Sequence, residues 1–514
     1  MTESCTSASE RVDDQRPAIH RGDCEALDGA SNVMTGASGV VATADGVMLG
    51  AADRAAPAPG GTAAHEPATT ASTNSTDECG LIRSVAIIPC PMTPRPIIAC
   101  RHPLRDVRVR VPASKSIANR ELVLSAIADG RSRLDMGRLD PGDDVRAMRQ
   151  ALASLGYQVE WDQTFQITVH GAEKIPHATG PVHAAEAGTV ARFALALAAL
   201  ADGATRFDGS ERLRERPTAP LVKALRDLGA KVDNDALPVT ITGPVRGGQV
   251  AVPGSQSSQF ASALLLVAAR MELGVDLEIT GSLVSAPFVD LTIAALEKRG
   301  VKVDAPTLDR IAVEPQRVKA RSFEIPGDAT AATYPAAAAA ICGGMVTIEN
   351  VDAHEIHGGQ GDVRFFSIVE EMGCRVSRGK GRVSVERVGR LQGIVANVRD
   401  CSDVFPSLAV IATQCETPTE LGGIAHTRLQ ESDRIHAVAD AINALGGRAT
   451  AYADSIRIEP APLHDGVVDA KLDHRVAMAF SVLGLQVPGI AIEGSDSVSK
   501  TFPDFYEMLK ELGR

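Results

Sequence analysis

The sequence predicts an α/β (α+β) fold built from six similar units, and three observations point to it. Glycines that end amphipathic helices recur at intervals of 73, 71, 73, 73 and 67 residues. Each unit contains a further helix with its own terminal glycine, followed by a β-branched run typical of a strand. Hydrophobic residues make up 44% of the 514 residues, which is enough for sizeable cores. Six units divide naturally into two domains of three.

The helices that close the six units all end just before a glycine. These helix ends are Leu155-Gly156, Leu228-Gly229, Arg299-Gly300, Met372-Gly373, Leu445-Gly446 and Leu512-Gly513. The other helices are rich in alanine and apolar on nearly all sides, as in residues 193–200 and 331–340. Helices of that kind are expected in the interior of a helix cluster.

The starts of these helices carry glycine, serine and charged residues. The six peptides are Ser114-Lys115-Ser116, Ala187-Gly188-Thr189, Ser257-Ser258-Gln259, Gly327-Asp328-Ala329-Thr330, Cys401-Ser402-Asp403 and Asp473-His474-Arg475. Four further helices are expected to begin near Arg216-Pro217, Ser285-Ala286-Pro287, Arg434 and Lys500-Thr501-Phe502-Pro503. Free N–H groups at several converging helix starts, with cations beside them, predict a site for a small and highly anionic substrate.

Any one of these peptides could be a plain helix cap, which is the commoner role of serine, aspartate and glycine there. Caps alone do not call for the cations that accompany them, namely Lys115, Arg120, Arg216, Arg434, Arg475 and Lys500. Asp403 and Glu431 lie in the same neighbourhoods. In such a basic cluster both carboxylates should be ionised, which suits proton transfer.

Composition excludes several other classes of protein. The net charge of −12 argues against nucleic acid as a principal partner, and the longest apolar runs are about half the ~18 residues that a membrane span needs. Nine cysteines without a C-x-x-C pair argue against a disulfide scaffold and a zinc site, so we expect no metal and a cytoplasmic location. Residues 1–80 hold twelve acidic residues, four arginines and no aromatic residue. We therefore expect residues 1–88 to be a disordered acidic tail.

Ordered motifs along the chain resemble those of the 3-phosphoshikimate 1-carboxyvinyltransferases, the EPSP synthases. The matching segments are residues 112–120 (PASKSIANR), 139–146 (LDPGDDVR), 187–192 (AGTVAR), 215–217 (ERP), 255–260 (SQSSQF), 431–434 (ESDR), 473–475 (DHR) and 500–504 (KTFPD). The resemblance implies two inverse α/β domains, each of three βαβαββ units, joined by two crossings of the chain. The first domain would comprise residues 89–113 plus 326–514, and the second residues 114–325.

The resemblance also implies a reaction. The family transfers the enolpyruvyl group of phosphoenolpyruvate to the 5-hydroxyl of shikimate 3-phosphate and releases phosphate, in the step before chorismate synthesis, without a metal or an organic cofactor. The residues implied for shikimate 3-phosphate are Lys115, Ser116, Arg120, Ser257, Ser258, Gln259, Ser285 and Asp403. Those implied for phosphoenolpyruvate are Lys115, Gly188, Arg216, Gln259, Arg434, Arg475 and Lys500. Asp403, Glu431 and Lys115 are implied to be catalytic, with Asp403 facing the 5-hydroxyl and Glu431 exchanging a proton with the methylene group.

The chain departs from the common family pattern at His426 and Gln430, where many members have Asn and Lys. A missing lysine removes one charge from the shikimate 3-phosphate side. Neutral Gln430 can still donate a hydrogen bond, and His426 would add charge only if protonated. We therefore expect an effect on affinity more than on the type of reaction.

Two rival functions are left open. UDP-N-acetylglucosamine enolpyruvyl transferase shares the fold and donor, but typically has a Lys-Asn pair where this chain has Lys115-Ser116. A catalytically silent binding protein of the same fold is the other, and the presence of Asp403, Glu431 and Lys115 argues against it. The partners expected are small molecules rather than nucleic acid or membrane, and the chain is expected to be a monomer.

Overall fold

The computed structural model describes residues 93–513. Contacts divide the chain into Met1–Val85 and Ala86–Arg514, and the second unit holds all of the described residues. Two hydrophobic cores lie within that unit. One is formed by residues 113–325, called here the middle lobe, and the other by residues 97–111 and 329–512, called the terminal lobe. The predicted tail of residues 1–88 lies outside the described residues.

The middle lobe contains three four-stranded sheets, with the orders β14-β3-β5-β4, β6-β7-β9-β8 and β10-β11-β13-β12. Their strands are β3 (Arg131–Asp135), β4 (Gln158–Trp161), β5 (Gln166–His170), β6 (Val182–His183), β7 (Gly203–Asp208), β8 (Lys231–Val232), β9 (Val239–Gly243), β10 (Gly248–Pro253), β11 (Val275–Thr280), β12 (Asp304–Thr307), β13 (Arg310–Val313) and β14 (Phe323–Glu324). The helices are α1 (Lys115–Ala126), α2 (Asp143–Ser154), α3 (Gly188–Ala198), α4 (Glu211–Glu215), α5 (Ala219–Asp227), α6 (Gln259–Ala268) and α7 (Pro287–Lys298).

The terminal lobe contains two four-stranded sheets, β16-β17-β15-β2 and β18-β19-β21-β20, and a three-stranded sheet, β1-β23-β22. Its strands are β1 (Arg95–Pro96), β2 (Leu104–Arg110), β15 (Gly344–Glu349), β16 (Cys374–Gly379), β17 (Arg382–Arg387), β18 (Val395–Asn397), β19 (Thr419–Gly422), β20 (Arg448–Ala451), β21 (Ser455–Glu459), β22 (Gly466–Asp469) and β23 (Ile490–Glu493). The helices are α8 (Ala329–Cys342), α9 (Arg364–Glu371), α10 (Phe405–Ala412), α11 (Arg434–Ala444), α12 (His474–Gln486) and α13 (Phe505–Leu512), with 3₁₀ turns η1 (Gly361–Val363), η2 (Arg399–Val404), η3 (Ala425–Leu429) and η4 (Ser495–Lys500).

The predicted βαβαββ unit is confirmed in the order of the elements. In the unit β6-α3-β7-α5-β8-β9, β6 pairs with β7 in parallel, and the closing hairpin β8-β9 is antiparallel. A parallel pair needs a crossover, which α3 supplies, whereas the hairpin needs only a short turn. The last unit is shorter: within residues 93–513 no hairpin follows α13, and β1 instead joins β23 in antiparallel pairing.

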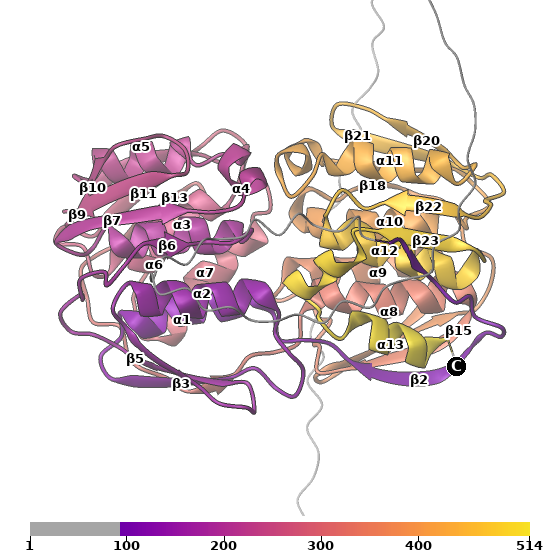
Figure 1. The fold of residues 1–514 in the computed structure, drawn as a ribbon, viewed down its shortest axis with the longest axis horizontal. Helices are drawn as coiled ribbons and strands as arrows, with labels where there is room; N and C mark the ends of the chain where they lie inside the picture. Colours follow the sequence, from indigo (N-terminus) through magenta and orange to yellow (C-terminus); the bar gives the residue numbers. More distant parts are fainter. Residues whose placement is uncertain (1–92, 514) are drawn as a thin grey trace, which may run out of the picture. The chain divides into compact units, whose positions relative to one another are not determined.

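The chain crosses between the lobes twice, side by side. Ser114 N–H donates to the carbonyl of Pro326, and Asp328 N–H donates to that of Pro112, each over 2.8 Å. The crossings also complete a sheet in each lobe, because β14 pairs in parallel with β3 and β2 pairs in parallel with β15. Figure 1 shows the consequence, with indigo β2 lying beside β15 among elements from much later in the chain.

The alanine-rich helices lie in the interior, as predicted. Every residue of α3 is buried, as are residues 260–268 of α6 and 329–341 of α8. Within the middle lobe α1, α3 and α6 contact one another, and α8, α10 and α12 do so in the terminal lobe. Figure 1 shows both groups surrounded by the sheets. Small side chains let these buried helices pack closely against one another.

Three of the predicted helix starts are displaced. Cys401 is not helical (φ −133°, ψ 40°), so η2 carries Asp403 and α10 begins only at Phe405. Arg216 is extended (ψ 143°), as residues before proline usually are, and α5 begins at Ala219. Lys500 ends η4, and α13 begins at Phe505. These three functional side chains therefore project from the segments before the helices, not from their first turns.

Candidate active site

A cavity lies between the lobes and is lined by residues of both. Of the fourteen residues predicted for the site, thirteen line it: Lys115, Ser116, Arg120, Gly188, Arg216, Ser257, Ser258, Gln259, Ser285, Asp403, Glu431, Arg434 and Arg475. Lys500 does not line the cavity, but its Nζ lies 3.3 Å from Oδ1 of Asp144 and 3.9 Å from Oε1 of Glu431, which both do.

The middle lobe presents the N-termini of α1, α3 and α6 to the cavity. At the start of α3, a Cβ on Gly188 would lie 2.6 Å from Nη1 of Arg192 and 2.9 Å from Nη2 of Arg216. Two guanidinium groups therefore pack directly against this glycine, and no larger residue fits without moving them. Burial and then Arg216 lower the pKa of Arg192 to about 9. Positive charge is concentrated at a point where free backbone N–H groups also favour an anion.

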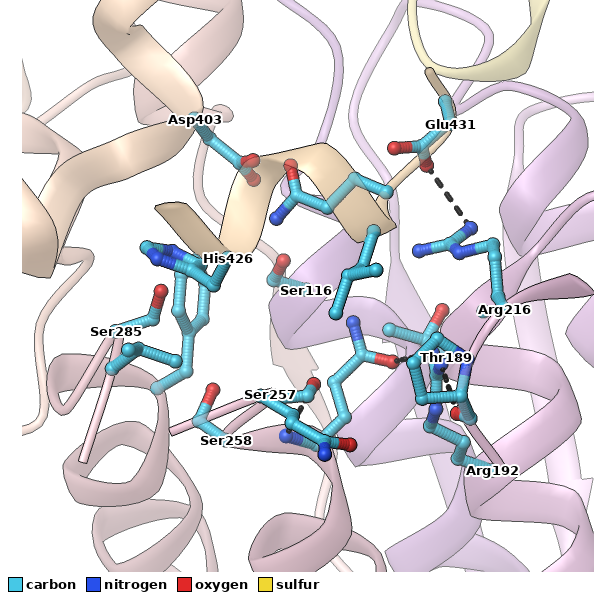
Figure 2. Close-up of a pocket in the computed structure, with 18 of the residues that line it drawn as sticks. Ser116, Thr189, Arg192, Arg216, Ser257, Ser258, Ser285, Asp403, His426 and Glu431 are labelled. Atoms are coloured by element: carbon cyan, nitrogen blue, oxygen red, sulfur yellow. Dashed lines mark hydrogen bonds and ion pairs between the residues drawn. The ribbon is translucent and has the colours of Figure 1, made fainter. Parts of the chain in front are cut away.

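Four serine side chains line the cavity. Figure 2 shows Asp403 above, Ser257 and Ser258 below, and Ser116 and Ser285 between them. Ser285 has φ +52°, a left-handed conformation that is rare for residues with a side chain. Its N–H donates to the carbonyl of Arg399 in the terminal lobe over 3.3 Å, so this strained backbone also joins the lobes.

Arg120 lines the cavity, yet its donors are engaged within the protein. Its guanidinium donates to Thr292 Oγ1 (2.8 Å), to the carbonyl of Ser116 (2.7 Å) and to that of Phe288 (2.9 Å). Burial lowers its pKa to about 9. These contacts fix the first turn of α1 relative to α7, so Arg120 also positions Ser116 at the cavity.

Arg434 is the centre of the terminal-lobe side. Its guanidinium pairs with Asp403 (2.9 Å), Glu431 (2.7 Å) and Asp473 (2.8 Å). Asp473 caps α12 by accepting from the N–H of Arg475, whose guanidinium binds Asp403 at 2.6 Å. Arg434 and Arg475 thus hold both predicted catalytic carboxylates in place.

These contacts decide the charge of the two carboxylates. Burial alone would raise the pKa of Asp403, but Arg475 and Arg434 outweigh it and lower that pKa. Burial likewise opposes ionisation of Glu431, and Arg216, Arg434 and Lys500 together hold its pKa well below the usual range. Both side chains are ionised at neutral pH, as the sequence predicted.

Ion pairs cross the cavity from lobe to lobe. Glu431 of the terminal lobe lies 3.4 Å from Nη1 of Arg216 in the middle lobe, and Figure 2 shows this pair. Lys500 pairs with Asp144, whose other oxygen binds Lys115 at 2.7 Å. All of the predicted cations except Arg120 therefore belong, with the predicted carboxylates, to one continuous network.

His426 and Gln430 both line the cavity. Burial lowers the pKa of His426 to about 4, so the ring is neutral at neutral pH and the charge considered for it is not supplied. Its Nε2 is 2.8 Å from Oγ of Ser402. The side-chain oxygen of Gln430 accepts from Arg434, so the amide nitrogen is the end that could donate elsewhere.

Sequence reasoning quoted Asp144, Arg192 and Asp473 within motifs but gave them no role. Arg192 donates to Oε1 of Gln259 over 2.8 Å and so orients that side chain. The sequence could have indicated these three residues as site residues, because each lies within three residues of a predicted site residue or forms part of a matched motif. His474, next to Arg475, is fully buried, and neither ring nitrogen has a hydrogen-bond partner; burial holds its pKa well below the usual range.

The balance of charge indicates what the cavity accepts. Six arginine and lysine side chains and three carboxylates line it, an excess of three positive charges. Guanidinium groups bind carboxylate and phosphate oxygens in pairs, so the arrangement suits small ligands that carry both. Among the described residues no group of His, Cys, Asp and Glu is arranged to hold a metal ion, and no helix there is long and apolar enough to span a membrane.

Comparison with known proteins finds a matching family model, similar sequences and a similar solved structure. Residues 104–509 match the family model of EPSP synthase (3-phosphoshikimate 1-carboxyvinyltransferase). The chain is 37% identical over 414 residues to the 3-phosphoshikimate 1-carboxyvinyltransferase of Methanoregula boonei, covering 79% of this chain and 97% of that one. It is 35% identical to that of Trichormus variabilis, covering 80% and 97%. A solved EPSP synthase from Acinetobacter baumannii superposes with a TM-score of 0.69 at 26% identity, covering 82% and 98%.

Proposed function

This chain belongs to the EPSP synthase family, and we propose that the cavity between its lobes is where phosphoenolpyruvate and shikimate 3-phosphate react. The enzyme transfers the carboxyvinyl group of phosphoenolpyruvate to the 5-hydroxyl of shikimate 3-phosphate and releases phosphate, a step of aromatic amino acid biosynthesis. One observation carries the assignment of the site. A single cavity gathers six cations and three carboxylates from both lobes, and it includes thirteen of the fourteen residues that the family motifs imply.

Phosphoenolpyruvate is bound at the side of the cavity where Gly188, Arg216, Arg434 and Arg475 converge. Its carboxylate and phosphate carry up to three negative charges, which match the local excess of cations. Lys115, Gln259 and Lys500 complete this subsite. The support is geometric: Arg192 holds Gln259 toward the cavity, and Glu431 and Asp144 tie Arg216, Lys115 and Lys500 into one network.

Shikimate 3-phosphate is bound against the middle lobe. Ser116, Ser257, Ser258 and Ser285 offer hydroxyl donors, and Lys115, Arg120 and Gln259 add charge or amide donors. Hydroxyl donors suit a substrate with both phosphate and hydroxyl groups. Asp403 reaches the same ligand from the terminal lobe.

The two carboxylates divide the proton transfers. Asp403 accepts the proton of the 5-hydroxyl as the hydroxyl oxygen attacks C2 of phosphoenolpyruvate. Glu431 takes up a proton from water, gives it to the methylene carbon in the addition and takes it back when phosphate leaves. Addition gives a tetrahedral intermediate, and elimination of phosphate requires a proton to leave the new methyl group again. Lys115 stabilises the phosphate that departs. Ionised groups within reach of the reacting atoms provide general acid–base catalysis worth about 10²–10⁴-fold.

Ligand anions would also make these carboxylates stronger bases. Arg475 and Arg434 lower the pKa of Asp403, and Arg216 and Arg434 lower that of Glu431. The carboxylate and phosphate of phosphoenolpyruvate compete for the same donors. Each guanidinium contact that passes to the ligand removes a factor that lowers the carboxylate pKa, and so moves the base toward the operating pH.

Four further assignments accompany this function. Residues 89–113 plus 326–514 form one domain and residues 114–325 the other, which the two separate cores support. The enzyme acts as a monomer, since one chain supplies every proposed site residue. It works in the cytoplasm, and residues 1 to about 85 are dispensable for turnover.

The test is a phosphate-release assay with purified chain and phosphoenolpyruvate, run with two acceptors. We expect release with shikimate 3-phosphate and none with UDP-N-acetylglucosamine. Release only with the nucleotide sugar would favour the rival transferase. Tight binding of both proposed ligands without any release would identify a silent binding protein. Asp403→Asn serves as the matched inactive control.

A further inference from the structure

Arg212 of α4 reaches from the middle lobe to the main chain of the terminal lobe. Its Nε donates to the carbonyl oxygens of Gln430 (3.1 Å) and Glu431 (2.9 Å), and its Nη2 donates to that of Gln430 (2.8 Å). Its Nη1 donates to Glu215 of the same helix over 2.8 Å, which holds the guanidinium in this orientation. Figure 1 shows α4 at the edge of the middle lobe that faces the terminal lobe.

The terminal-lobe segment that Arg212 contacts has little other support for its main chain. Gln430 and Glu431 lie between η3 and α11, in neither a helix nor a strand. In the described part of the chain, no group other than Arg212 donates to either of their carbonyl oxygens. The next residue, Ser432, is tied through its hydroxyl to Asp473 over 3.0 Å. Arg212 therefore fixes the two peptide groups that carry the start of the Glu431 side chain.

The segment from α4 to its C-terminal cap contacts Glu431 at two points. Arg212 binds its carbonyl, and Arg216, which ends the helix, lies 3.4 Å from its carboxylate. The two arginines differ in their access to ligands. Arg216 lines the cavity between the lobes, whereas Arg212 does not. A ligand in that cavity can take Arg216 away from Glu431, but it does not compete for Arg212.

We propose that Arg212 is a positioning residue, which holds Glu431 within reach of the reacting methylene carbon while ligands occupy the cavity. This role rests on the proposed function. Anionic ligands draw Arg216 and Arg434 away from the Glu431 carboxylate, and the contact of Arg212 with the main chain then keeps the side chain in place. Because that contact joins the two lobes, it positions Glu431 in the state that encloses both ligands.

The first test compares two substitutions in α4 by steady-state phosphate release. Arg212→Met keeps the length of the side chain but removes its donors, so kcat should fall about 10–100-fold. Each KM should stay within about threefold, because Arg212 touches neither ligand. Arg212→Lys retains a cationic donor without the planar fork, so it should recover part of the loss.

The matched control is Arg214→Met. Arg214 lies in the same helix, and its side chain is 46% exposed against 39% for Arg212. It pairs with Asp208 of its own lobe and does not contact the terminal lobe. Its kcat should stay within about twofold of the unsubstituted chain, as for a surface ion pair.

A double-mutant cycle separates positioning from a general structural role. In Glu431→Gln the proton-transferring carboxylate is absent, so adding Arg212→Met should change single-turnover phosphate release by less than about twofold. A residue that only stabilises the fold would reduce release by the same factor in both backgrounds. Loss of the Arg212 effect in Glu431→Gln is therefore the result that assigns its action to Glu431.

Amide hydrogen exchange of the full chain tests the contact without turnover. Exchange in the peptide 427–436 should be faster in Arg212→Met and unchanged in Arg214→Met, with the rest of the chain unaffected. Unchanged exchange in that peptide, faster exchange throughout the chain, or equal losses of release in both backgrounds would overturn the proposal. Absence of phosphate release from the unsubstituted chain would contradict the proposed function and, with it, any role of Arg212 in turnover.

Discussion

The two lobes hold their cationic side chains at the cavity in different ways. In the middle lobe, Arg120 and Arg192 donate to neutral oxygens, such as Thr292 Oγ1 and the side-chain oxygen of Gln259. In the terminal lobe, Arg434 is bound to three carboxylates. Arg120 and Arg192 of the middle lobe are therefore cations without a carboxylate partner, which suits the binding of anions. The terminal lobe presents ionised carboxylates with fixed orientation, which suits proton transfer.

The largest effect should follow from removing the terminal-lobe carboxylates. Asp403→Asn and Glu431→Gln keep the shape of each side chain but remove its ability to accept a proton, so kcat should fall by about 10²-fold or more. Steady-state phosphate release measures this. Glu416→Gln, at an exposed carboxylate of the same lobe, is the control and should be near normal. A near-normal kcat in either site variant would remove that residue from the mechanism.

A cation of the middle lobe should affect binding more than chemistry. Arg216→Gln removes a guanidinium beside Gly188, and a charge-assisted hydrogen bond is worth about 1.5–3 kcal/mol. The KM for phosphoenolpyruvate should rise roughly 10–100-fold. Arg226→Gln, in α5 of the same lobe but exposed, should leave it unchanged. If instead kcat collapses while KM holds, Arg216 acts in the chemical step and its proposed binding role is wrong.

Asp362 allows the charge state of the terminal lobe to be tested by pH. Burial, and then the charge of Asp403, raise its pKa to about 7. Between its ordinary pKa near 4 and about 7 the folded protein binds more protons there than the unfolded chain, so its contribution to stability is lost as pH rises through that window. Asp362→Asn cannot titrate. The unfolding temperature of Asp362→Asn relative to the unsubstituted chain should therefore increase from pH 5 to pH 8, and a constant difference would contradict the raised pKa.

The smallest effect should come from Gln430→Lys. An ammonium there would add a charge-assisted contact to shikimate 3-phosphate, worth ~1 kcal/mol in a partly solvated cleft, and lower its KM several-fold. Arg434 loses the oxygen of Gln430 but keeps Asp403, Glu431 and Asp473, so kcat should change little. A tenfold loss of kcat would show that Gln430 is needed to orient Arg434.

The sequence predicted the repeat and the residues at the helix starts, because a glycine after each helix and a cap before it are local signals. It did not predict how the lobes share charge. Nothing local in Glu431 indicates that it meets Arg216 across the cavity, or that Lys500 shares Asp144 with Lys115. The turn η2 at Asp403 and the left-handed Ser285 were also unpredicted, since both depend on tertiary contacts that override local preference. The neutral state of His426 follows from burial, which a motif does not report.

Equilibrium binding and single-turnover phosphate release, measured on the same preparation of Glu431→Gln, test the central claim most directly. That claim is that the terminal-lobe carboxylates transfer protons and are not needed to bind the anionic ligands. The account predicts that the variant binds shikimate 3-phosphate and phosphoenolpyruvate within several-fold of the unsubstituted enzyme. It also predicts that phosphate release from the bound pair falls by about 10²-fold or more. Loss of ligand binding, or release at the normal rate, would contradict it.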